Sequence, residues 1–366
     1  MSAGINKPRF IIQTLVAAIA VLAFCAGINV VVDVRGVYGG PDDGDDLGLR
    51  DYVAALRRQE HGLIRDMRLR ETKRELLRQS AADCFVIGSS HVGAISRDSL
   101  PNVLGGCREF VNLYLDGAVF EDEIAFLALI AEKPTTKKVL IEIAPWSLRE
   151  NLDARWRTMG ALYDRGRAYF GLSPRPEAFN ASIDFAANLI NFEYLKRNLE
   201  AFFSGRADNR FVIQPATANG TGLSMDQAIT LPDGSRKYSA KAMARLPLPW
   251  ERVGTGNFKI RKPYVNPRAA SDFEAVLVAL RKRGIEPVLL LMPYHPKVLT
   301  CEFPPVCEAM TLTTQKVREI AARHRFTIVG GFDPRPFGIG QNEFFDYHHV
   351  LRNAIHKLDL KTPSLR

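Results

Sequence analysis

The chain has 366 residues, of which 46% are hydrophobic and 24% charged, and its formal net charge is +9. This ordinary composition excludes a mainly disordered chain, and the length is sufficient for one large domain that carries an insertion. The positive charge suits anionic polymers, anionic lipid head groups or nucleic acid, although a solvated basic surface explains it equally well.

An uncharged segment, Phe10 to Val32, lies near the N-terminus. As a helix it would be about 34 Å long, enough to cross a hydrocarbon core of about 30 Å. Lys7 and Arg9 precede it and aspartates follow it, so the positive-inside tendency predicts a cytoplasmic N-terminus. Residues 1–34 are therefore expected to be a short tail and a single-pass anchor in the inner membrane of a bacterium, which argues against nucleic acid as a partner. The alternative is a cleaved signal peptide, but the segment is long for one and no A-x-A site ends it.

Residues 35–82 are expected to contain a linker and a juxtamembrane helix. The first part, up to Asp46, is rich in Gly and Asp. From Leu47 to Gln79 the sequence is charged, with apolar residues near helical spacing, which predicts one helix.

The rest of the chain, 83–366, alternates short apolar runs with amphipathic segments. Strands are expected at Cys84–Gly88, Glu109–Leu115, Lys137–Pro145, Ile285–Met292 and Arg325–Phe332, and helices at Phe120–Lys133, Ser271–Gly284, Thr311–His324 and His348–Leu358. This pattern predicts a three-layer α/β/α sandwich around a five-stranded parallel sheet, with its site at the carboxyl ends of the strands. Residues 152–262 break the alternation and are expected to form a largely helical insertion, either a lid or a substrate-facing subdomain.

Four cysteines follow the anchor, and an even number in an exported domain permits two disulfides. Cys301 and Cys307 bracket a short loop and are expected to pair, which leaves Cys84 with Cys107. Four free thiols are an open alternative. A zinc site is disfavoured because no two cysteines have C-x-x-C spacing, and no metal or other cofactor is expected.

Two motifs could carry chemistry. Gly88-Ser89-Ser90-His91 closes the first strand, where a serine hydroxyl can face an oxyanion site, although a serine here can also simply cap the next helix. Asp346-Tyr347-His348-His349 precedes the last helix, and in D-x-x-H the Asp can orient an imidazole that activates a serine. Both motifs lie at one edge of the predicted sheet, which favours a joint Ser–His–Asp site.

These motifs resemble those of the SGNH (GDSL-like) hydrolase superfamily, whose sheet is flavodoxin-like. In particular, the chain is similar to membrane-anchored bacterial branches that carry G-S-S in place of G-D-S, including proteins of D-alanyl transfer and alginate O-acetylation. FVIGSSHVGAI resembles the nucleophile block, which implies Ser90 as nucleophile and oxyanion donor. FVNLYLDGAVFEDE resembles the block whose glycine N–H supports the oxyanion, here Gly117. FFDYHHV resembles the last block, which implies Asp346 as orienter and His349 as general base.

The third block of the family, G-x-N-D, is absent. Asn151 is the nearest candidate for its oxyanion asparagine, and Asn112 is an alternative that could instead be structural. Further residues are expected to line the substrate pocket. The simpler alternative is that they are core, turn or solvent-facing residues. They are His91, Trp146, Arg155, Tyr294 and His295.

The sequence thus predicts an extracytoplasmic serine esterase or O-acyltransferase. Its expected substrates are acyl esters of an envelope polysaccharide or a glycolipid, in the periplasm or outside the cell. Transfer would need an acyl donor outside the cytoplasm, for which a membrane-bound acyltransferase partner is a candidate. The alternative is a catalytically inactive scaffold of the same fold that binds envelope polysaccharide, an alternative that the missing block favours.

Overall fold

The computed structural model describes residues 7–32, 47–58, 62–66, 69–100, 102–149, 156, 159–174, 189, 192–203, 211–214, 228–238, 243–244, 246, 260, 262–301 and 304–360. They fall into two compact units. One unit combines 1–44 with 175–210, and the other combines 45–174 with 211–366. The 152–262 segment is therefore divided between the two units.

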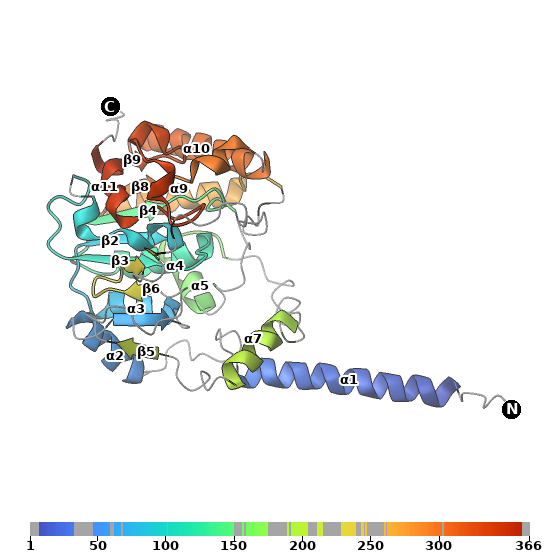
Figure 1. Cartoon of the computed structure of the whole chain (residues 1–366). Coiled ribbons are helices and arrows are strands. Elements are labelled where there is room, and N and C mark those ends of the chain that lie inside the picture. The colour runs from blue at the N-terminus through green and yellow to red at the C-terminus, as the bar shows by residue number, and fades with distance from the viewer. Residues whose placement is uncertain are drawn as a thin grey trace. The chain divides into compact units, whose positions relative to one another are not determined.

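The larger unit is built on a five-stranded, all-parallel sheet with the strand order β3-β2-β4-β8-β9 (Figure 1). The strands are β2 (Cys84–Gly88), β3 (Phe110–Tyr114), β4 (Lys138–Glu142), β8 (Glu286–Leu291) and β9 (Thr327–Gly330). Numbered along the chain, this order is 2-1-3-4-5. The order reverses between β2 and β4, and doubly wound sheets bind ligands at such a switch point, beyond the carboxyl ends of the strands. The prediction of five parallel strands is confirmed.

Helices flank this sheet (Figure 1). They are α2 (Leu47–Arg57), α3 (Leu69–Gln79), α4 (Phe120–Ala131), α5 (Gly160–Tyr169), α9 (Pro267–Lys282), α10 (Pro304–His324) and α11 (Arg352–Leu360). Short 3₁₀ helices connect them: η1 (Ser90–Ala94), η2 (Arg97–Ser99), η6 (Pro296–Thr300), η7 (Arg335–Phe337) and η8 (Gln341–Glu343). The α9 helix begins four residues earlier than the sequence pattern predicts. Asn266 caps it by accepting hydrogen bonds from two backbone N–H groups, and Pro267 suits its first turn.

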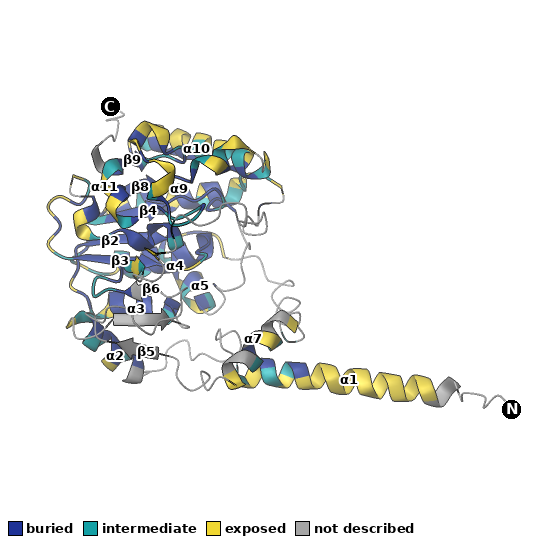
Figure 2. Ribbon diagram, in the orientation of Figure 1, coloured by how far each residue is buried: buried dark blue, intermediate teal, exposed yellow. Residues whose placement is uncertain are grey.

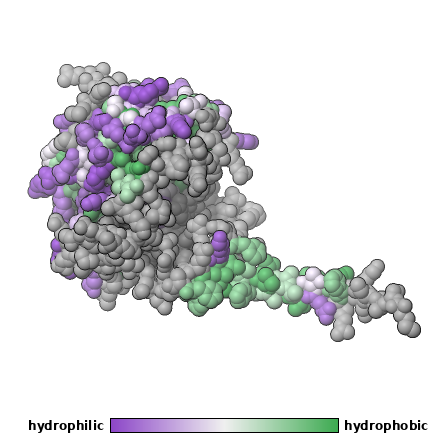
Figure 3. Space-filling model, in the orientation of Figure 1, coloured by the Kyte–Doolittle hydropathy of each residue, from purple (hydrophilic) through white to green (hydrophobic). Residues whose placement is uncertain are grey.

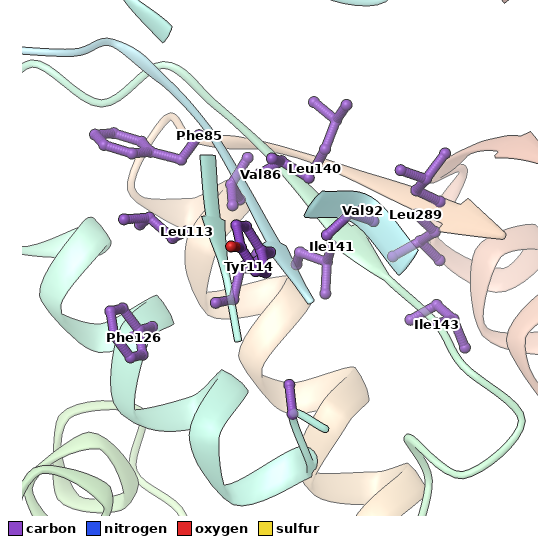
Figure 4. Close-up of a cluster of buried hydrophobic side chains, with 14 of the residues drawn as sticks. Phe85, Val86, Val92, Leu113, Tyr114, Phe126, Leu140, Ile141, Ile143 and Leu289 are labelled. Atoms are coloured by element: carbon purple, nitrogen blue, oxygen red, sulfur yellow. The ribbon is translucent and has the colours of Figure 1, made fainter. Parts of the chain in front are cut away.

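The core lies between the sheet and its helices, and the strands are buried along their length (Figure 2). Phe85, Leu140 and Leu289, from three neighbouring strands, have no exposed surface (Figure 4). Parallel strands that are covered on both faces need apolar side chains at successive positions. This pattern is why these strands could be predicted from the sequence.

A second sheet of four antiparallel strands, in the order β5-β1-β6-β7, was not predicted. Its strands are β1 (Gly62–Asp66), β5 (Phe211–Gln214), β6 (Ala228–Thr230) and β7 (Arg236–Tyr238). The single helix expected over 47–79 is wrong, because β1 separates α2 from α3. Glycine at position 62 is unfavourable inside a helix, and Leu63 gains pairing partners from both β5 and β6. The expected largely helical insertion likewise contains strands as well as helices.

Two other boundaries differ from the prediction. The α10 helix begins at Pro304, so Cys307 lies within it, and proline is well suited to a first helical turn. The last helix begins at Arg352 instead of His348. An antiparallel bridge between Phe344 and Val350 keeps the intervening residues in a loop.

The smaller unit contains α1 (Lys7–Val32) and α7 (Phe192–Phe203). Residues Phe10–Val32 of α1 are long and apolar enough to cross a membrane, as either a signal sequence or an anchor. Their apolar surface is visible along α1 in Figure 3. In the larger unit, disulfides join Cys84 to Cys107 and Cys301 to Cys307, a feature typical of domains outside the cytoplasm.

Candidate active site

The chain turns sharply after β2. Gly88 ends the strand, and a Cβ atom at this position would lie 2.3 Å from the Cβ of Glu142 on β4, so the close approach requires glycine. Ser89 then caps η1, its Oγ accepting a hydrogen bond from the N–H of His91 at 3.4 Å. Ser89 is therefore the residue that caps η1. Ser90, the first residue of η1, is partly exposed at the carboxyl edge of the sheet.

The Asp346–His349 segment forms a closed loop that faces Ser90. Besides the bridge at its ends, the N–H of Phe345 donates to the carbonyl of His349 at 2.8 Å. One oxygen of Asp346 accepts hydrogen bonds from the backbone N–H groups of His348 and His349, at 2.8 and 2.9 Å. The carboxylate is thus fixed to its own loop, as in an Asx turn.

Ser90, His349 and Asp346 form a continuous hydrogen-bonded chain. The Nε2 of His349 lies 2.8 Å from Ser90 Oγ, and its Nδ1 lies 2.8 Å from both carboxylate oxygens of Asp346. A carboxylate at Nδ1 holds the ring proton there and leaves Nε2 free to accept the hydroxyl proton. The His349 and Asp346 side chains remain 16% and 25% exposed, so solvent reaches the group.

Burial and neighbouring charges shift the pKa values of Asp346 and His348. Burial alone would raise the pKa of Asp346, but the charge and hydrogen bond of His349 hold that pKa well below its ordinary value. Burial, together with the neighbouring ring of His91, lowers the pKa of His348 to about 3. His348 is therefore neutral near pH 7 and does not compete with His349 for the proton or the carboxylate.

A buried carboxylate that the sequence analysis missed supports the nucleophile turn. Glu142, the last residue of β4, is only 1% exposed. It accepts hydrogen bonds from the backbone N–H of Ser89 and from Ser89 Oγ, the latter at 3.0 Å. Its Oε1 also lies 3.0 Å from the Nδ1 of His91. The detectable signal was a glutamate inside an otherwise apolar strand, directly before the active-site edge.

A second buried glutamate lies near the first. Burial and the charge of Glu142 raise the pKa of Glu123, on α4, well above its ordinary value. The hydroxyl of Ser147 lies 3.5 Å from Glu123. The raised pKa of Glu123 favours its neutral form, which limits the negative charge buried below the nucleophile turn.

Two of the residues predicted to line a pocket, Trp146 and Tyr294, pack around the buried ring of His91. The ring of His91 is 3% exposed and packs edge-on against Trp146, Tyr294 and His349, with centroids 5.0–5.5 Å apart. It also stacks on His348 at 5.6 Å. Tyr294 is fully buried, and its hydroxyl lies 3.4 Å from the Nδ1 of His91.

His295, in the segment between β8 and η6, supports the Asp346–His349 loop. It is fully buried, its backbone N–H donates to the carbonyl of Tyr347 at 3.1 Å, and its ring packs against Phe344. Burial and the nearby Lys297 lower its pKa to about 4. Its contacts are those of a supporting residue beneath the loop, and those of Tyr294 and His91 are similar.

The predicted oxyanion residues have different positions. Gly117 lies in the turn between β3 and α4 with φ of +62°, a conformation that glycine adopts without strain. Asn112 is fully buried, and its amide donates to the carbonyls of Val92 and Ile95, both at 2.8 Å, so it holds η1 in place. Asn151 and Arg155 lie outside the described residues.

The second sheet borders the site, which sequence analysis did not anticipate. The ring of Tyr238, at the end of β7, stacks on Phe345, which immediately precedes Asp346, with centroids 3.8 Å apart. Arg236 on the same strand forms an ion pair with Asp116, which immediately precedes Gly117. The short, isolated runs that form β6 and β7 carry little periodic signal, so this contact could be found only from the structure.

Comparison with known proteins supplies no homologue: no protein-family model matches the sequence. No curated protein matches it either.

Within the described ranges, no group of three or more His, Cys, Asp and Glu side chains is arranged to hold a metal ion. Any functional assignment therefore depends on the geometry of the site itself.

Proposed function

We propose that the protein is a membrane-anchored, extracytoplasmic serine esterase or O-acyltransferase. The observation that carries the proposal is the hydrogen-bonded chain of Ser90, His349 and Asp346, with 2.8 Å at both of its junctions. A serine hydroxyl is a weak nucleophile by itself, and a histidine held by a carboxylate is the common means of activating it.

The reaction follows from this geometry. Ser90 Oγ attacks the ester carbonyl carbon while His349 Nε2 accepts the hydroxyl proton, and the backbone N–H groups of Ser90 and Gly117 stabilise the oxyanion. Collapse breaks the bond to the leaving alcohol, which takes the proton from His349. Water or a sugar hydroxyl then attacks the acyl-enzyme, again losing its proton to His349, and this step restores Ser90. Asp346 stays ionised and orients the imidazole throughout.

The fold supports a family assignment to the SGNH (GDSL-like) superfamily. The 2-1-3-4-5 strand order is the flavodoxin-like order, and the nucleophile turn and Glu142 flank its switch point. Ser90 stands as the third residue of G-x-S, and Asp346 with His349 forms D-x-x-H. The chain departs from the superfamily in lacking the G-x-N-D block, whose asparagine helps to stabilise the oxyanion. Gly117 and Ser90 would then carry this role, with Asn151 as a further candidate.

The proposed location is the inner membrane of a bacterium, with the N-terminus in the cytoplasm. Lys7 and Arg9 precede the apolar helix, as expected for a cytoplasmic end. Two disulfides fit an oxidising compartment for the α/β domain. Substrates at this location are envelope polysaccharides or glycolipids, and the net positive charge suits anionic ones. A transferase would receive its acyl group from a membrane-bound acyltransferase partner.

Labelling with a serine-reactive fluorophosphonate tests the assignment. The full chain in detergent micelles should react, and Ser90→Ala should abolish labelling. Ser96→Ala, in the neighbouring 3₁₀ capping turn, is the matched control and should label like the parent chain. Labelling of the Ser90→Ala variant at the parent rate would refute the nucleophile. A folded parent chain that never reacts would favour the inactive scaffold.

A second experiment separates transfer from hydrolysis. The full chain is incubated with p-nitrophenyl acetate and an excess of a glycan acceptor, and the products are analysed by mass spectrometry. Acetylated glycan that requires Ser90 supports an O-acyltransferase. If free acetate is the sole product even at high acceptor concentration, the protein is an esterase and not an acyltransferase.

A further inference from the structure

The helix α7, from the segment that interrupts the α/β pattern, has a well-defined apolar stripe. At 100° per residue, five apolar positions fall within about 100° of its circumference, the width typical of an amphipathic helix. They are Phe192, Leu195, Leu199, Phe202 and Phe203. The three phenylalanines are 64%, 59% and 80% exposed, so the described part of the protein leaves them uncovered.

Beside this stripe, α7 is fastened to the membrane-crossing helix. The side-chain amide of Asn198 donates to the amide oxygen of Asn29 on α1 at 3.0 Å, and both residues are fully buried. The amide of Asn29 in turn donates to the carbonyl of Leu189, close before α7, at 2.8 Å. Together these two hydrogen bonds fix the position of α7 along α1.

The point of attachment sets the depth of α7. Cys25 and Asn29 are the buried positions of α1, and both lie in its last two turns. At 1.5 Å per residue they stand about 5–10 Å before the end of the helix at Val32. Interfacial amphipathic helices bury their apolar faces to a similar depth of about 5–10 Å.

We infer that α7 is an interfacial helix, whose phenylalanine stripe enters the outer leaflet beside the anchor. The inference rests on the proposed retention of α1 in the membrane. The occupant of the stripe is lipid because α7 is attached to a helix whose other apolar side chains are exposed along its length, such as Phe24 at 63%. Lys196 is exposed at the edge of the stripe, where its ammonium group can reach anionic head groups.

This assignment gives part of the 152–262 segment, which the sequence predicts to be a lid or a substrate-facing subdomain, a role at the membrane. Two parts of the chain, separated by more than a hundred residues, would contact the bilayer: α1 across it and α7 at its surface. Aromatic side chains are favoured at the membrane–water boundary, and three of them on one short helix add a second attachment to that of the anchor.

An environment-sensitive probe tests the inference in the full-length protein. In a Cys25→Ala background the remaining cysteines are disulfide-bonded, so a cysteine introduced as Phe203→Cys can be labelled selectively with an NBD maleimide. The labelled chain is reconstituted into phosphatidylcholine–phosphatidylglycerol vesicles that contain lipids with a nitroxide at a shallow or a deep acyl position. Arg197→Cys, on the opposite face of α7 by helical periodicity, is the matched control.

The expected result is a blue-shifted emission at position 203, quenched more strongly by shallow than by deep nitroxides, with aqueous emission at position 197. Equal aqueous emission at both positions would overturn the inference. So would emission at position 203 that changes with the protein-to-lipid ratio but is insensitive to nitroxide lipids, because a second protein copy would then cover the stripe.

Two further measurements on the same samples test separately the two proposals on which this inference rests or to which it is added: the retained anchor and the serine enzyme. An N-terminal epitope tag that remains on the mature chain reports retention of α1. Fluorophosphonate labelling reports the Ser90 site, and Phe202→Ser with Phe203→Ser should leave it unchanged while weakening lipid contact. Loss of the tag would refute the anchor, and loss of labelling in the parent chain would refute the enzyme, each independently of the probe at position 203.

Discussion

At the scale of single residues, the nucleophile turn depends on a carboxylate that performs no proton transfer in the proposed reaction. Glu142 accepts hydrogen bonds from the backbone and side chain of Ser89 and contacts His91. These groups are buried, so loss of the carboxylate would remove the acceptor of the Ser89 N–H and one hydrogen-bond partner each from Ser89 Oγ and His91. The position of Ser90 Oγ relative to His349 therefore depends on Glu142.

We predict that Glu142→Gln lowers the rate of ester hydrolysis roughly 100-fold, the order expected for a misplacement of about 1 Å. The amide has one acceptor oxygen in place of two and turns a donor toward the N–H of Ser89. Steady-state kinetics with p-nitrophenyl acetate should show a lower kcat with little change in KM. Glu286→Gln, at the exposed opposite end of the neighbouring strand, is the matched control. Equal kcat in the two variants would contradict the positioning role.

A second prediction at this scale concerns acid stability. His348 and His295 have pKa values of about 3 and about 4 in the folded protein, below the unfolded value of about 6.5. Below that pH the unfolded chain binds more protons, so stability is complete above about pH 6.5 and declines as the pH falls through this window. The depressed pKa of Asp346 adds a further loss as the pH falls below about 4.

The loss by pH 4 should reach at most about 3 kcal/mol for each buried ring, and less where water reaches it. Urea unfolding of the full chain in detergent, repeated between about pH 7 and pH 4, measures it. The His348→Gln variant should show a shallower pH dependence, whereas His356→Gln, on the exposed face of α11, should not. A parent chain with constant stability over this range would rule out buried neutral imidazoles.

At the scale of elements, the sequence was most informative where burial is two-sided. The central positions of β2, β4 and β8 are apolar, so these strands were predicted closely, as was the turn after β2. The loop before α11 was instead predicted as the start of that helix. The strand β1 was missed because its partners β5 and β6 are more than a hundred residues away and their pairing has no local signal. Glu142 was missed although it interrupts an otherwise apolar strand, because the groups that it binds lie in the turn after β2, outside its own segment.

The two disulfides make unequal contributions at this scale, because they close loops of different length. Cys84 and Cys107 are 23 residues apart, and Cys301 and Cys307 are 6 apart. In the loop-entropy treatment, the longer crosslink stabilises the chain by about 3 kcal/mol and the shorter by about 2 kcal/mol. We therefore predict a larger fall in the free energy of unfolding for Cys84→Ala with Cys107→Ala than for the other pair. Urea titration measures the free energy of unfolding of both double variants. Equal decreases would argue against loop entropy as the main source of the stabilisation.

At the scale of the whole molecule, the chain combines an apolar helix with a disulfide-containing α/β unit, and the two features constrain each other. Disulfides are typical of domains outside the cytoplasm, which suggests that the larger unit is translocated. The apolar helix has cationic residues on its N-terminal side, where they resist translocation. A retained anchor satisfies both conditions with a single crossing, whereas a cleaved signal would release the domain.

This topology makes a prediction that can be measured in spheroplasts. Protease added from outside should destroy a C-terminal tag and leave a short protected fragment with an N-terminal tag, because only residues up to about Val32 are shielded by the bilayer and the cytoplasm. Inserting four lysines directly after residue 32 would strengthen the opposing charge and reduce the amount of correctly oriented chain, whereas four serines at the same point should not. A mature protein that lacks residues before 33, and that washes off membranes with carbonate, would show that the helix is a cleaved signal sequence.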